Sequence, residues 1–426
     1  VIMQKLKVFF LKNITWIYTL EYIAFSIVLL FVVSLIDLRI LPIKDYLPDI
    51  IKLRVDFSQG ILTSLAAAFL TITTFTFSTI LTVLNTYASS FTPRVVENFI
   101  NRKITLKVVG IFIGGFFYCI GSLIFTREVL HNEAVISGFV AIIYSIICII
   151  YFIIFVQEVI TKFQGVNVIL DVADMAQKVI DEEVAIRKQS QAIQRKEHYV
   201  THQIQAKQSG YFSLVDLDAI LSMMKDQEGY LSIDCKIGQY VAKGMDIATV
   251  SLKDVFEEEL EEKILDTFVF QDQKLAATDY RYNITKLLEI ALRAISPGIN
   301  DPNTAIHCIN KLGVLLSPMA SIDTYHIQKA ENRQFRIYYS SYGFQDDLET
   351  FYLPLMQYGK EDLQVVVAIL QSLTLLYQNA TQINQRHIQT VIQHLEEKIK
   401  PCFTTSLESS ILLQHLQGFK DTSQEG

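Results

Sequence analysis

The sequence predicts a mainly α-helical membrane protein, with four transmembrane helices and an α+β cytoplasmic region that contains a small β hairpin module. Composition is the first reason: 51% of the 426 residues are hydrophobic and only 19% are charged, which is too apolar for an ordinary soluble chain. The distribution of charge is the second reason. Residues 1–162 carry 13 Lys and Arg against 9 Asp and Glu, whereas the remainder carries 24 against 35. The acidic remainder lacks the basic surface that nucleic acid requires, so we expect no nucleic-acid partner.

Four apolar runs supply the expected transmembrane helices. They span Thr15–Ile36, Phe57–Pro93, Val108–Thr126 and Ala134–Gln157. Each contains the ~20 apolar residues that a spanning helix needs, so the lipid bilayer is the first expected partner. The second run is longer than a bilayer demands and should tilt or extend beyond the headgroups. No run carries a charged residue near its middle, which removes the usual mark of a proton relay, voltage sensor or ion-coupled pump.

Lysine and arginine residues predict the orientation, because cytoplasmic flanks carry an excess of them. On the side of the N-terminus there are 8: Lys5, Lys7, Lys12, Arg94, Arg102, Lys103, Lys107 and Lys162. On the opposite side there are 5: Arg39, Lys44, Lys52, Arg54 and Arg127. This bias favours cytoplasmic N- and C-termini, with everything after the fourth run on the cytoplasmic side.

We expect four domains along the chain. In order, they are a four-helix transmembrane domain at 1–162, a helical stalk at 163–197, a small β-rich module at 198–253, and a helical cytoplasmic domain at 254–426. The stalk is predicted from apolar residues at helical spacing. The module is predicted from strand-like alternation in Tyr199–Ala206 and Gly210–Val215, followed by glycines suited to tight turns.

The second apolar run is unusually rich in hydroxyl side chains. Five polar residues spaced three and four apart share one face of the expected helix: Thr71, Thr74, Ser78, Thr82 and Asn85. Such a face suits a water path or weak ion binding, which makes these residues pore-lining candidates. In the alternative, each hydroxyl bonds to the carbonyl one turn earlier and the face packs against neighbouring helices.

The third apolar run contains Gly110 and Gly114. Glycines at this spacing let two helix backbones approach closely, so both are predicted helix-packing residues. The partner is either another helix of the same bundle or a helix of a second copy of the chain. The second case would make the protein a homo-oligomer.

The C-terminal half contains a stiff helix–turn–helix elbow, within YNITKLLEIALRAISPGINDPNTA. Its first helix should end near Ile295, because Pro297 and Gly298 stop it. Asp301 is a suitable N-cap for the second helix, and Pro302 fits its first turn. The elbow candidates for binding a ligand or a partner are Arg293, Ser296, Pro297, Gly298, Asn300, Asp301 and Pro302. In the alternative, these residues only cap the helices and turn the chain.

The sequence gives little sign of an enzyme. The alternative is a hydrolase built from Ser296, Asp301 and His307, but the sequence shows no activated nucleophile. Its five cysteines are scattered and show no CxxC spacing, so neither a zinc site nor a disulfide framework is indicated. His198 and His202 lie in a strand-like segment, which holds them too far apart for a metal site. There is no GxSxG, P-loop or HExxH motif. We therefore expect no catalytic residue, no metal and no cofactor.

Several segments occur together in a specific order. The most distinctive is ALRAISPGINDPNTA at Ala291–Ala305, preceded by ILTSLAAAFLTITTFTFSTILTV from Ile61, SGYFSLVDLDAIL from Ser209 and IGQYVAKGMDIATV from Ile237. Together they resemble an uncharacterised bacterial membrane-protein family, catalogued as domain of unknown function 2254, over nearly the whole chain. The resemblance implies a multi-pass protein of the bacterial plasma (inner) membrane and no agreed activity. The family's Gly-x-x-Arg-Thr segment before the elbow has no counterpart here, because Val269–Asp279 contains no arginine.

These features predict a homo-oligomeric, channel-like or transport-related integral membrane protein. In this hypothesis the Thr/Ser-rich second span lines a water path, the cytoplasmic region gates it, and ions are possible partners. Only a ring of copies places the second span around an axis. The alternative is a membrane-anchored sensor or scaffold that binds a ligand or partner at the cytoplasmic elbow.

Overall fold

The chain divides into two compact units, which we call the membrane unit (Leu6–Asn167) and the C-terminal unit (Val168–Gly426). The computed structural model describes residues 14–90, 92, 94, 103–126, 134–162, 165–190, 200–253, 258–329 and 334–425. Five of the basic residues that predict the orientation lie outside the described residues: Lys5, Lys7, Lys12, Arg102 and Arg127.

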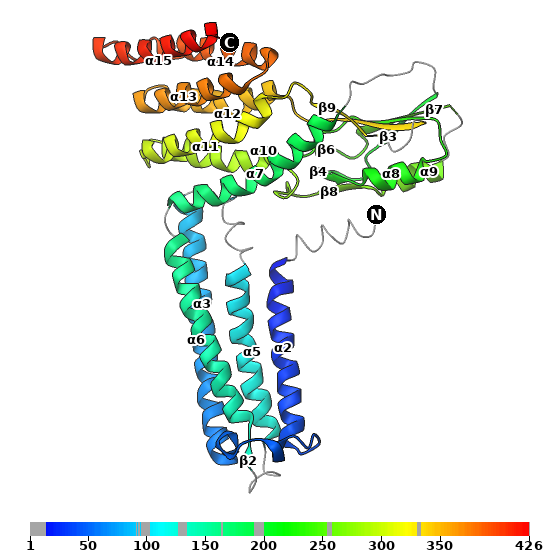
Figure 1. Cartoon of the computed structure of the whole chain (residues 1–426), viewed down its shortest axis with the longest axis vertical. Coiled ribbons are helices and arrows are strands. Elements are labelled where there is room, and N and C mark those ends of the chain that lie inside the picture. Colours follow the sequence, from blue (N-terminus) through cyan, green and yellow to red (C-terminus); the bar gives the residue numbers. More distant parts are fainter. Residues whose placement is uncertain are drawn as a thin grey trace. The chain divides into compact units, whose positions relative to one another are not determined.

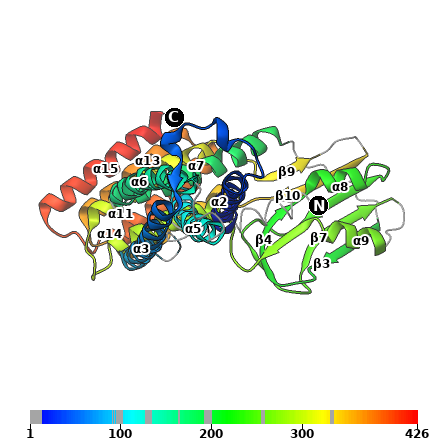
Figure 2. The same cartoon turned by 90° about the horizontal axis from the view of Figure 1, so that it is seen from below.

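Within its described part, the membrane unit is built from helices that run side by side (Figure 1, Figure 2). They are α2 (Ile14–Asp37), α3 (Val55–Ser90), α5 (Lys103–Phe125) and α6 (Ser137–Lys162). Each is long and apolar enough to cross a membrane, which confirms the predicted set of four spans. The second span is the longest, with 36 residues in its helix, as its long uncharged run predicts.

Polar contacts tie the helix ends together at one end of the membrane unit. Strand β1 (Leu53–Arg54) pairs antiparallel with β2 (Ala134–Val135), which joins the start of α3 to the start of α6. The buried carboxylate of Asp37, at the end of α2, accepts the N–H groups of Ile136 and Ser137 at 2.8 and 3.2 Å. It thereby satisfies two backbone donors at the start of α6.

Helix α7 (Gly165–Gln189) opens the C-terminal unit. Its apolar stripe, which includes Val172, Ala176 and Ile180, is buried rather than exposed along a free stalk. This helix lies within the predicted stalk range 163–197, and from Val168 onward it belongs to the C-terminal unit.

The C-terminal unit contains two sheets. The larger has the strand order β3-β7-β5-β10-β9, and the smaller has the order β6-β4-β8. Their strands are β3 (Val200–Gln205), β4 (Gly210–Val215), β5 (Gly229–Ile233), β6 (Tyr240–Val241), β7 (Asp246–Leu252), β8 (Phe268–Gln271), β9 (His326–Lys329) and β10 (Phe335–Ser340). Strands β5 and β10 are parallel, and every other pair in these two sheets is antiparallel.

The β-rich part extends beyond its predicted end at residue 253. Strand β10 joins the larger sheet beside β5, and β8 joins the smaller sheet beside β4. The shared core draws on both sides of the predicted boundary, with Leu231 and Val250 before it and Phe268 and Ile337 after it. The alternation of apolar and polar residues within one segment does not reveal which distant strand pairs with it, because strand pairing is decided by tertiary packing.

Helices make up the rest of the C-terminal unit. The short helices α8 (Leu217–Met223) and α9 (Glu258–Leu265) accompany the sheets. The others form a stack of consecutive, packed helices (Figure 1). In order they are α10 (Tyr280–Ala294), α11 (Pro302–Ala320), α12 (Phe344–Gly359), α13 (Leu363–Asn379), α14 (Gln382–Ile399) and α15 (Ser406–Glu425). The stack positions the elbow, which is the connection between α10 and α11.

Candidate functional site

The polar face of α3 is exposed within the membrane unit, and all five pore-lining candidates lie on it. The hydroxyls of Thr71, Thr74 and Thr82 each donate to the carbonyl oxygen four residues earlier, at 2.9 to 3.0 Å. The side chains of Ser78 and Asn85 make no hydrogen bond within the part of the chain that the structure describes. The face therefore combines three internally satisfied hydroxyls with two polar groups that are open to another partner.

The glycines of α5 lie where that helix packs against α2. A Cβ on Gly110 would approach the carbonyl oxygen of Thr19 to 2.8 Å, and one on Gly114 would overlap the hydroxyl of Ser26. The Ser26 hydroxyl also lies 2.8 Å from the hydroxyl of Tyr144 on α6. Both glycines thus lie at a close helix–helix contact within one chain, which is the first of the two arrangements that their spacing predicts.

The elbow is held by local hydrogen bonds. The carboxylate of Asp301 accepts the N–H and hydroxyl of Thr304 at 3.2 and 2.6 Å, which confirms Asp301 as the N-cap of α11. Asn300 has a φ of 51°, a left-handed conformation that asparagine tolerates better than most residues. The hydroxyl of Ser296 donates to the carbonyl oxygen of Arg293 at 2.6 Å. Capping and turning thus account for much of the elbow's polar chemistry.

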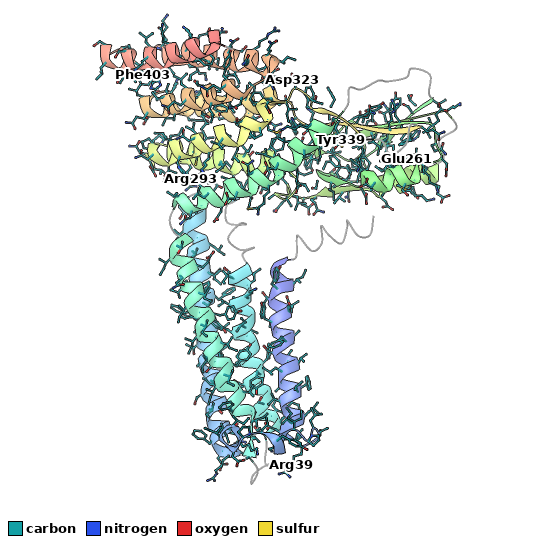
Figure 3. The ribbon with its side chains drawn as sticks, viewed as in Figure 1. Arg39, Glu261, Arg293, Asp323, Tyr339 and Phe403 are labelled. Carbon is teal, nitrogen blue, oxygen red and sulfur yellow. The ribbon has the colours of Figure 1, made fainter. Side chains whose placement is uncertain are left out.

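The elbow also forms one wall of an open cleft of about 830 Å³. The opposite wall is formed by the end of α12 and the α12–α13 connection, Gln357–Asp362, which brings Lys360 and Glu361 to the cleft. Five elbow candidates line it: Arg293, labelled in Figure 3, together with Ser296, Pro297, Asn300 and Pro302. Gly298 and Asp301 are not among the lining residues. The cleft thus joins elbow residues to a second, mixed-charge segment that the sequence alone did not associate with them.

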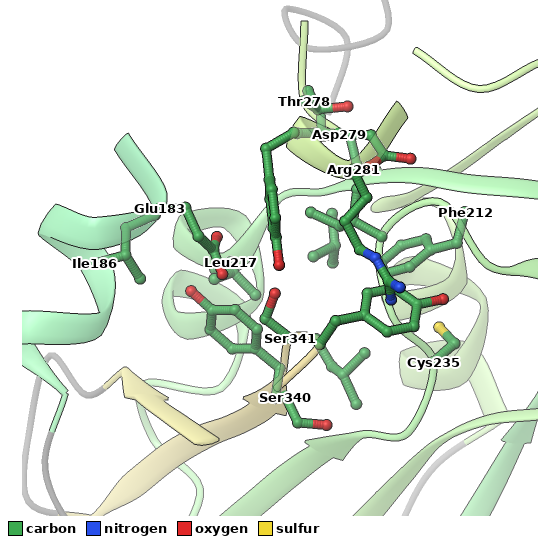
Figure 4. Close-up of a pocket in the computed structure, with 17 residues that line it drawn as sticks. Glu183, Ile186, Phe212, Leu217, Cys235, Thr278, Asp279, Arg281, Ser340 and Ser341 are labelled. Carbon is green, nitrogen blue, oxygen red and sulfur yellow. The ribbon is translucent and has the colours of Figure 1, made fainter. Parts of the chain in front are cut away.

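A second cavity, of about 190 Å³, lies where α7, the sheets and the start of α10 meet (Figure 4). Phe212, Leu217 and Cys235 contribute apolar surface. Glu183 and Arg281 lie on opposite sides of the open space in Figure 4. The volume is close to the ~150 Å³ of a cavity that holds benzene, so the space suits a ligand no larger than a substituted ring.

Arg187 provides a buried positive charge beside this cavity. Its guanidinium group pairs with Glu183 at 2.8 Å and donates to the carbonyl oxygen of Tyr342 at 3.0 Å. A buried charge is tolerated when it is paired and hydrogen-bonded. Arg187 therefore links α7 to the segment between β10 and α12.

A second buried ion pair joins α10 to α12. The Nε atom of Arg281 lies 3.1 Å from a carboxylate oxygen of Asp347, and the hydroxyl of Tyr280 donates to the other oxygen at 2.8 Å. The guanidinium of Arg281 also lies 3.8 Å from the ring centroid of Tyr342, in a cation–π contact. Complete burial raises the pKa of Asp347 to about 7, against the opposing effects of Arg281 and the Tyr280 hydrogen bond.

Asp279 supplies a buried carboxylate to the lining of the cavity. It is the N-cap of α10 and accepts the N–H of Tyr282 at 3.0 Å. Lys274 Nζ lies 4.0 Å from its other oxygen. Burial raises the pKa of Asp279, although the Tyr282 N–H and Lys274 oppose that shift.

The cavity's chemistry indicates binding more than nucleophilic catalysis. Burial raises the pKa of the Cys235 thiol to about 12, which is the opposite of what an activated thiolate needs. No group of three or more His, Cys, Asp or Glu residues suited to a metal ion occurs among the described residues. The available groups are hydroxyls, paired charges and apolar surface, which is the usual composition of a small-ligand pocket.

Sequence reasoning did not identify this cavity. Its polar groups come from α7, the start of α10 and the end of β10, which are far apart along the chain. The pair Asp346-Asp347 at the start of α12 is a local signal of the neighbouring buried ion pair, although neither residue lines the cavity. A helix N-terminus explains Asp346, whose carboxylate accepts the N–H of Gly343 at 2.9 Å, but it does not explain the buried Asp347.

Comparison with known proteins settles the family. A family model described as "Predicted membrane protein (DUF2254)" matches residues 12–374. The chain belongs to this family. The matched DUF2254 region includes the four spans, both sheets and the elbow, so the resemblance inferred from the sequence is confirmed.

Curated relatives of this DUF2254 protein occur in mycobacteria. The uncharacterized proteins Rv1290c of Mycobacterium tuberculosis (strain H37Rv) and Mb1321c of Mycobacterium bovis are each 26% identical to it over 188 residues. The alignment covers 42% of this chain and 36% of each relative, so the chain spans about a third of their length. No solved structure matches the chain.

Proposed function

We propose that this DUF2254 protein is a homo-oligomeric, channel-like or transport-related membrane protein in which the polar face of α3 lines a water path. The C-terminal unit gates that path, and ions are the transported species. The observation that carries the proposal is the exposure of Ser78 and Asn85 on a membrane-spanning helix, without a hydrogen-bond partner within the described chain.

Lipid tails cannot form hydrogen bonds with the side chains of Ser78 and Asn85. A polar group left without a hydrogen bond in hydrocarbon costs several kcal/mol, by an order-of-magnitude estimate. Water or a neighbouring copy of α3 supplies the missing partners, whereas the back-bonded threonines are compatible with either setting. In a symmetric ring of copies with α3 towards the axis, Ser78 and Asn85 can bond to water or to α3 of the neighbouring copy.

The wider proposal follows from the basic flanks and the family. The protein resides in the bacterial plasma (inner) membrane as a multi-pass protein, with both termini and the C-terminal unit in the cytoplasm. It carries out no enzymatic turnover and needs no cofactor, metal or nucleic acid.

Ion flux through the purified protein in liposomes tests the water path. The double variant Thr74→Leu/Ser78→Leu is expected to lower K⁺ or Cl⁻ flux strongly, because it replaces the wet face with apolar side chains. The matched control is Leu70→Val/Phe77→Leu, which alters two exposed residues of α3 that lie seven positions apart, at a similar depth and beside that face. Equal flux in both double variants, or no flux for the native protein across several ions and pH values, would rule out this role for α3.

The elbow cleft favours a second candidate function, a membrane-anchored sensor or scaffold. The observation is that conformationally special residues of the elbow, such as Pro297 and Asn300, line an open cleft together with Lys360 and Glu361. A ligand or partner bound there would contact two helical connections at once.

Capture of partners by the detergent-solubilised protein tests this candidate. Arg293→Ala alters the cleft wall and is expected to remove any partner that binds there. Thr381→Ala is the control, because Thr381 is the N-cap of α14 and is absent from the cleft lining. Asp301→Ala separates elbow geometry from direct contact. Identical partner sets for all three variants would count against the elbow as a binding site.

A further inference from the structure

In the connection between α2 and α3, apolar side chains are exposed and a charged side chain is buried, which is the reverse of a loop in water. Within it, η1 (Lys44–Tyr46) and η2 (Asp49–Ile51) are short 3-10 turns. Its large apolar and aromatic side chains point outward: Ile40 is 64% exposed, Ile43 46%, Tyr46 88% and Ile50 82%. By contrast, Lys44 is buried, and its ammonium group donates to the carbonyl oxygen of Asp37 at 3.3 Å. A buried cation with surrounding exposed isoleucines is informative, whereas a single exposed isoleucine is not.

This segment is held against the end of α2. The N–H groups of Ile40 and Leu41 donate to the carbonyl oxygen of Leu35 at 3.0 and 3.1 Å, which folds the chain back on the helix. Its far end is fixed by the β1–β2 pair. The exposed side chains are therefore presented by hydrogen-bonded backbone at both ends of the connection.

The exposed apolar surface continues onto the spans themselves. Leu35 lies in the last turn of α2, Leu38 directly follows that helix and Phe57 lies in the first turn of α3; all three are exposed. Those positions belong to the surface that a spanning helix presents to lipid. The connection thus extends an apolar surface already assigned to the bilayer rather than forming an isolated patch.

Charged residues accompany the apolar ones in an interfacial pattern. Arg39, which is labelled in Figure 3, directly follows the last turn of α2, and Lys52 and Arg54 precede α3. Lys52 pairs with Asp49 at 3.0 Å, and Arg54 lies 3.6 Å from Asp56. Basic side chains beside apolar and tyrosine side chains are typical of segments that lie between headgroups and acyl chains.

We propose that the α2–α3 connection is a membrane-interface anchor, with Ile40, Ile43, Tyr46 and Ile50 embedded at the headgroup–acyl boundary of the leaflet in which α2 ends. The partner of this surface is the lipid bilayer, rather than a second protein. Burial in that boundary removes the exposed apolar area from water, and Arg39, Lys52 and Arg54 lie at the depth of the lipid phosphates. The inference is independent of whether α3 lines a water path.

Site-specific fluorescence quenching tests the anchor in the full chain. The sequence has one tryptophan, Trp16, so Trp16→Phe gives a background without tryptophan fluorescence. Tyr46→Trp in that background is then reconstituted into vesicles of phosphatidylcholine and phosphatidylglycerol with brominated acyl chains. Bromine near the headgroup end is expected to quench this tryptophan more strongly than bromine near the chain terminus. Acrylamide in the water should quench it several-fold less than it quenches the control Tyr358→Trp, whose native side chain is 69% exposed in the C-terminal unit.

Two outcomes would overturn the proposal. Quenching by acrylamide at the control's rate, without quenching by brominated lipid, would place the connection in water. Protection from both quenchers would show that protein, such as a second copy, covers it. Ile50→Trp repeats the measurement at a second position, so the result does not depend on the folding of one variant.

Discussion

The carboxylate of Asp279 lies directly against the backbone of Gly238 in the C-terminal unit. A Cβ placed on Gly238 would overlap one Asp279 oxygen, and Gly238 also has a φ of 82°, in the region that favours glycine. The other Asp279 oxygen caps α10 through the N–H of Tyr282. The contact between Asp279 and Gly238 therefore couples the turn between β5 and β6 to the start of α10, which lines the cavity.

Replacement of Gly238 by alanine should destabilise the protein through two effects, backbone strain and collision with Asp279. Gly244→Ala is the matched control, because Gly244 has a φ of 86° and no atom within 4 Å of an added Cβ. Strain alone is expected to cost Gly244→Ala about 1–3 kcal/mol of unfolding free energy, and Gly238→Ala should lose clearly more. Denaturant unfolding of the C-terminal unit in the full-length protein measures both; equal losses would show that the carboxylate moves aside freely.

Protonation of Asp347 should make the stability of the C-terminal unit depend on pH. Its pKa is raised by burial from the ordinary value of 3.8 to about 7 in the folded protein. Between these values the folded state binds more protons than the unfolded state, so stability falls as pH rises from about 4 to about 7. By linkage, the unfolding free energy should fall by roughly 4 kcal/mol across this pH range.

Asp347→Asn isolates this contribution because asparagine keeps the size of the side chain and cannot titrate. The melting temperature of the native protein should fall more steeply between pH 5 and pH 7 than that of the variant. The comparison is the difference between the two curves, since other groups titrate equally in both. Parallel curves would mean that the carboxyl group is ionised throughout this range.

Loss of the Arg187 side chain should be far more damaging than loss of an exposed ion pair. Arg187→Ala leaves Glu183 without its partner and removes the donor to the Tyr342 carbonyl, at an expected cost of about 3–5 kcal/mol. The control is Lys207→Ala, which breaks an exposed pair with Glu262 and should cost about 0–1 kcal/mol. Urea unfolding measures both variants. A small effect of Arg187→Ala would show that Glu183 becomes neutral or solvated without penalty.

Local chemistry made much of the fold predictable. Four apolar runs defined four spans, and Asp301-Pro302 defined the start of α11, because each signal depends on residues close in sequence. The same applies to β4, whose predicted range Gly210–Val215 is the observed one.

Long-range pairing was not predictable in this way. Strand β10 completes a sheet begun by β5, and the cavity gathers Glu183, Arg281 and Ser341 from separate elements. Nothing in the residues next to Glu183 indicates a buried site, since an acidic residue in an amphipathic helix usually faces water. The charged pairs became recognisable as a cluster only after the sheets and helices were assembled.

Close packing of α5 on α2 makes Gly114 sensitive to a single added methyl group. Gly114→Ala should destabilise the helix bundle, because the new Cβ collides with the Ser26 hydroxyl, while the subunit number stays unchanged. Gly60→Ala on α3 is the matched control, since an added Cβ there meets no atom within 4 Å. That change should stabilise the helix by about 0.5–1 kcal/mol.

Unfolding in increasing sodium dodecyl sulfate, together with mass measurement of the complex in a mild detergent, separates stability from assembly. The intramolecular contact predicts a lower unfolding midpoint for Gly114→Ala and the same mass as the native complex. A changed mass with an unchanged midpoint would instead place Gly114 at a contact between copies. A collision with Ser26 within each bundle lowers the unfolding midpoint. An unchanged midpoint means that the collision is relieved there, so the two results exclude each other.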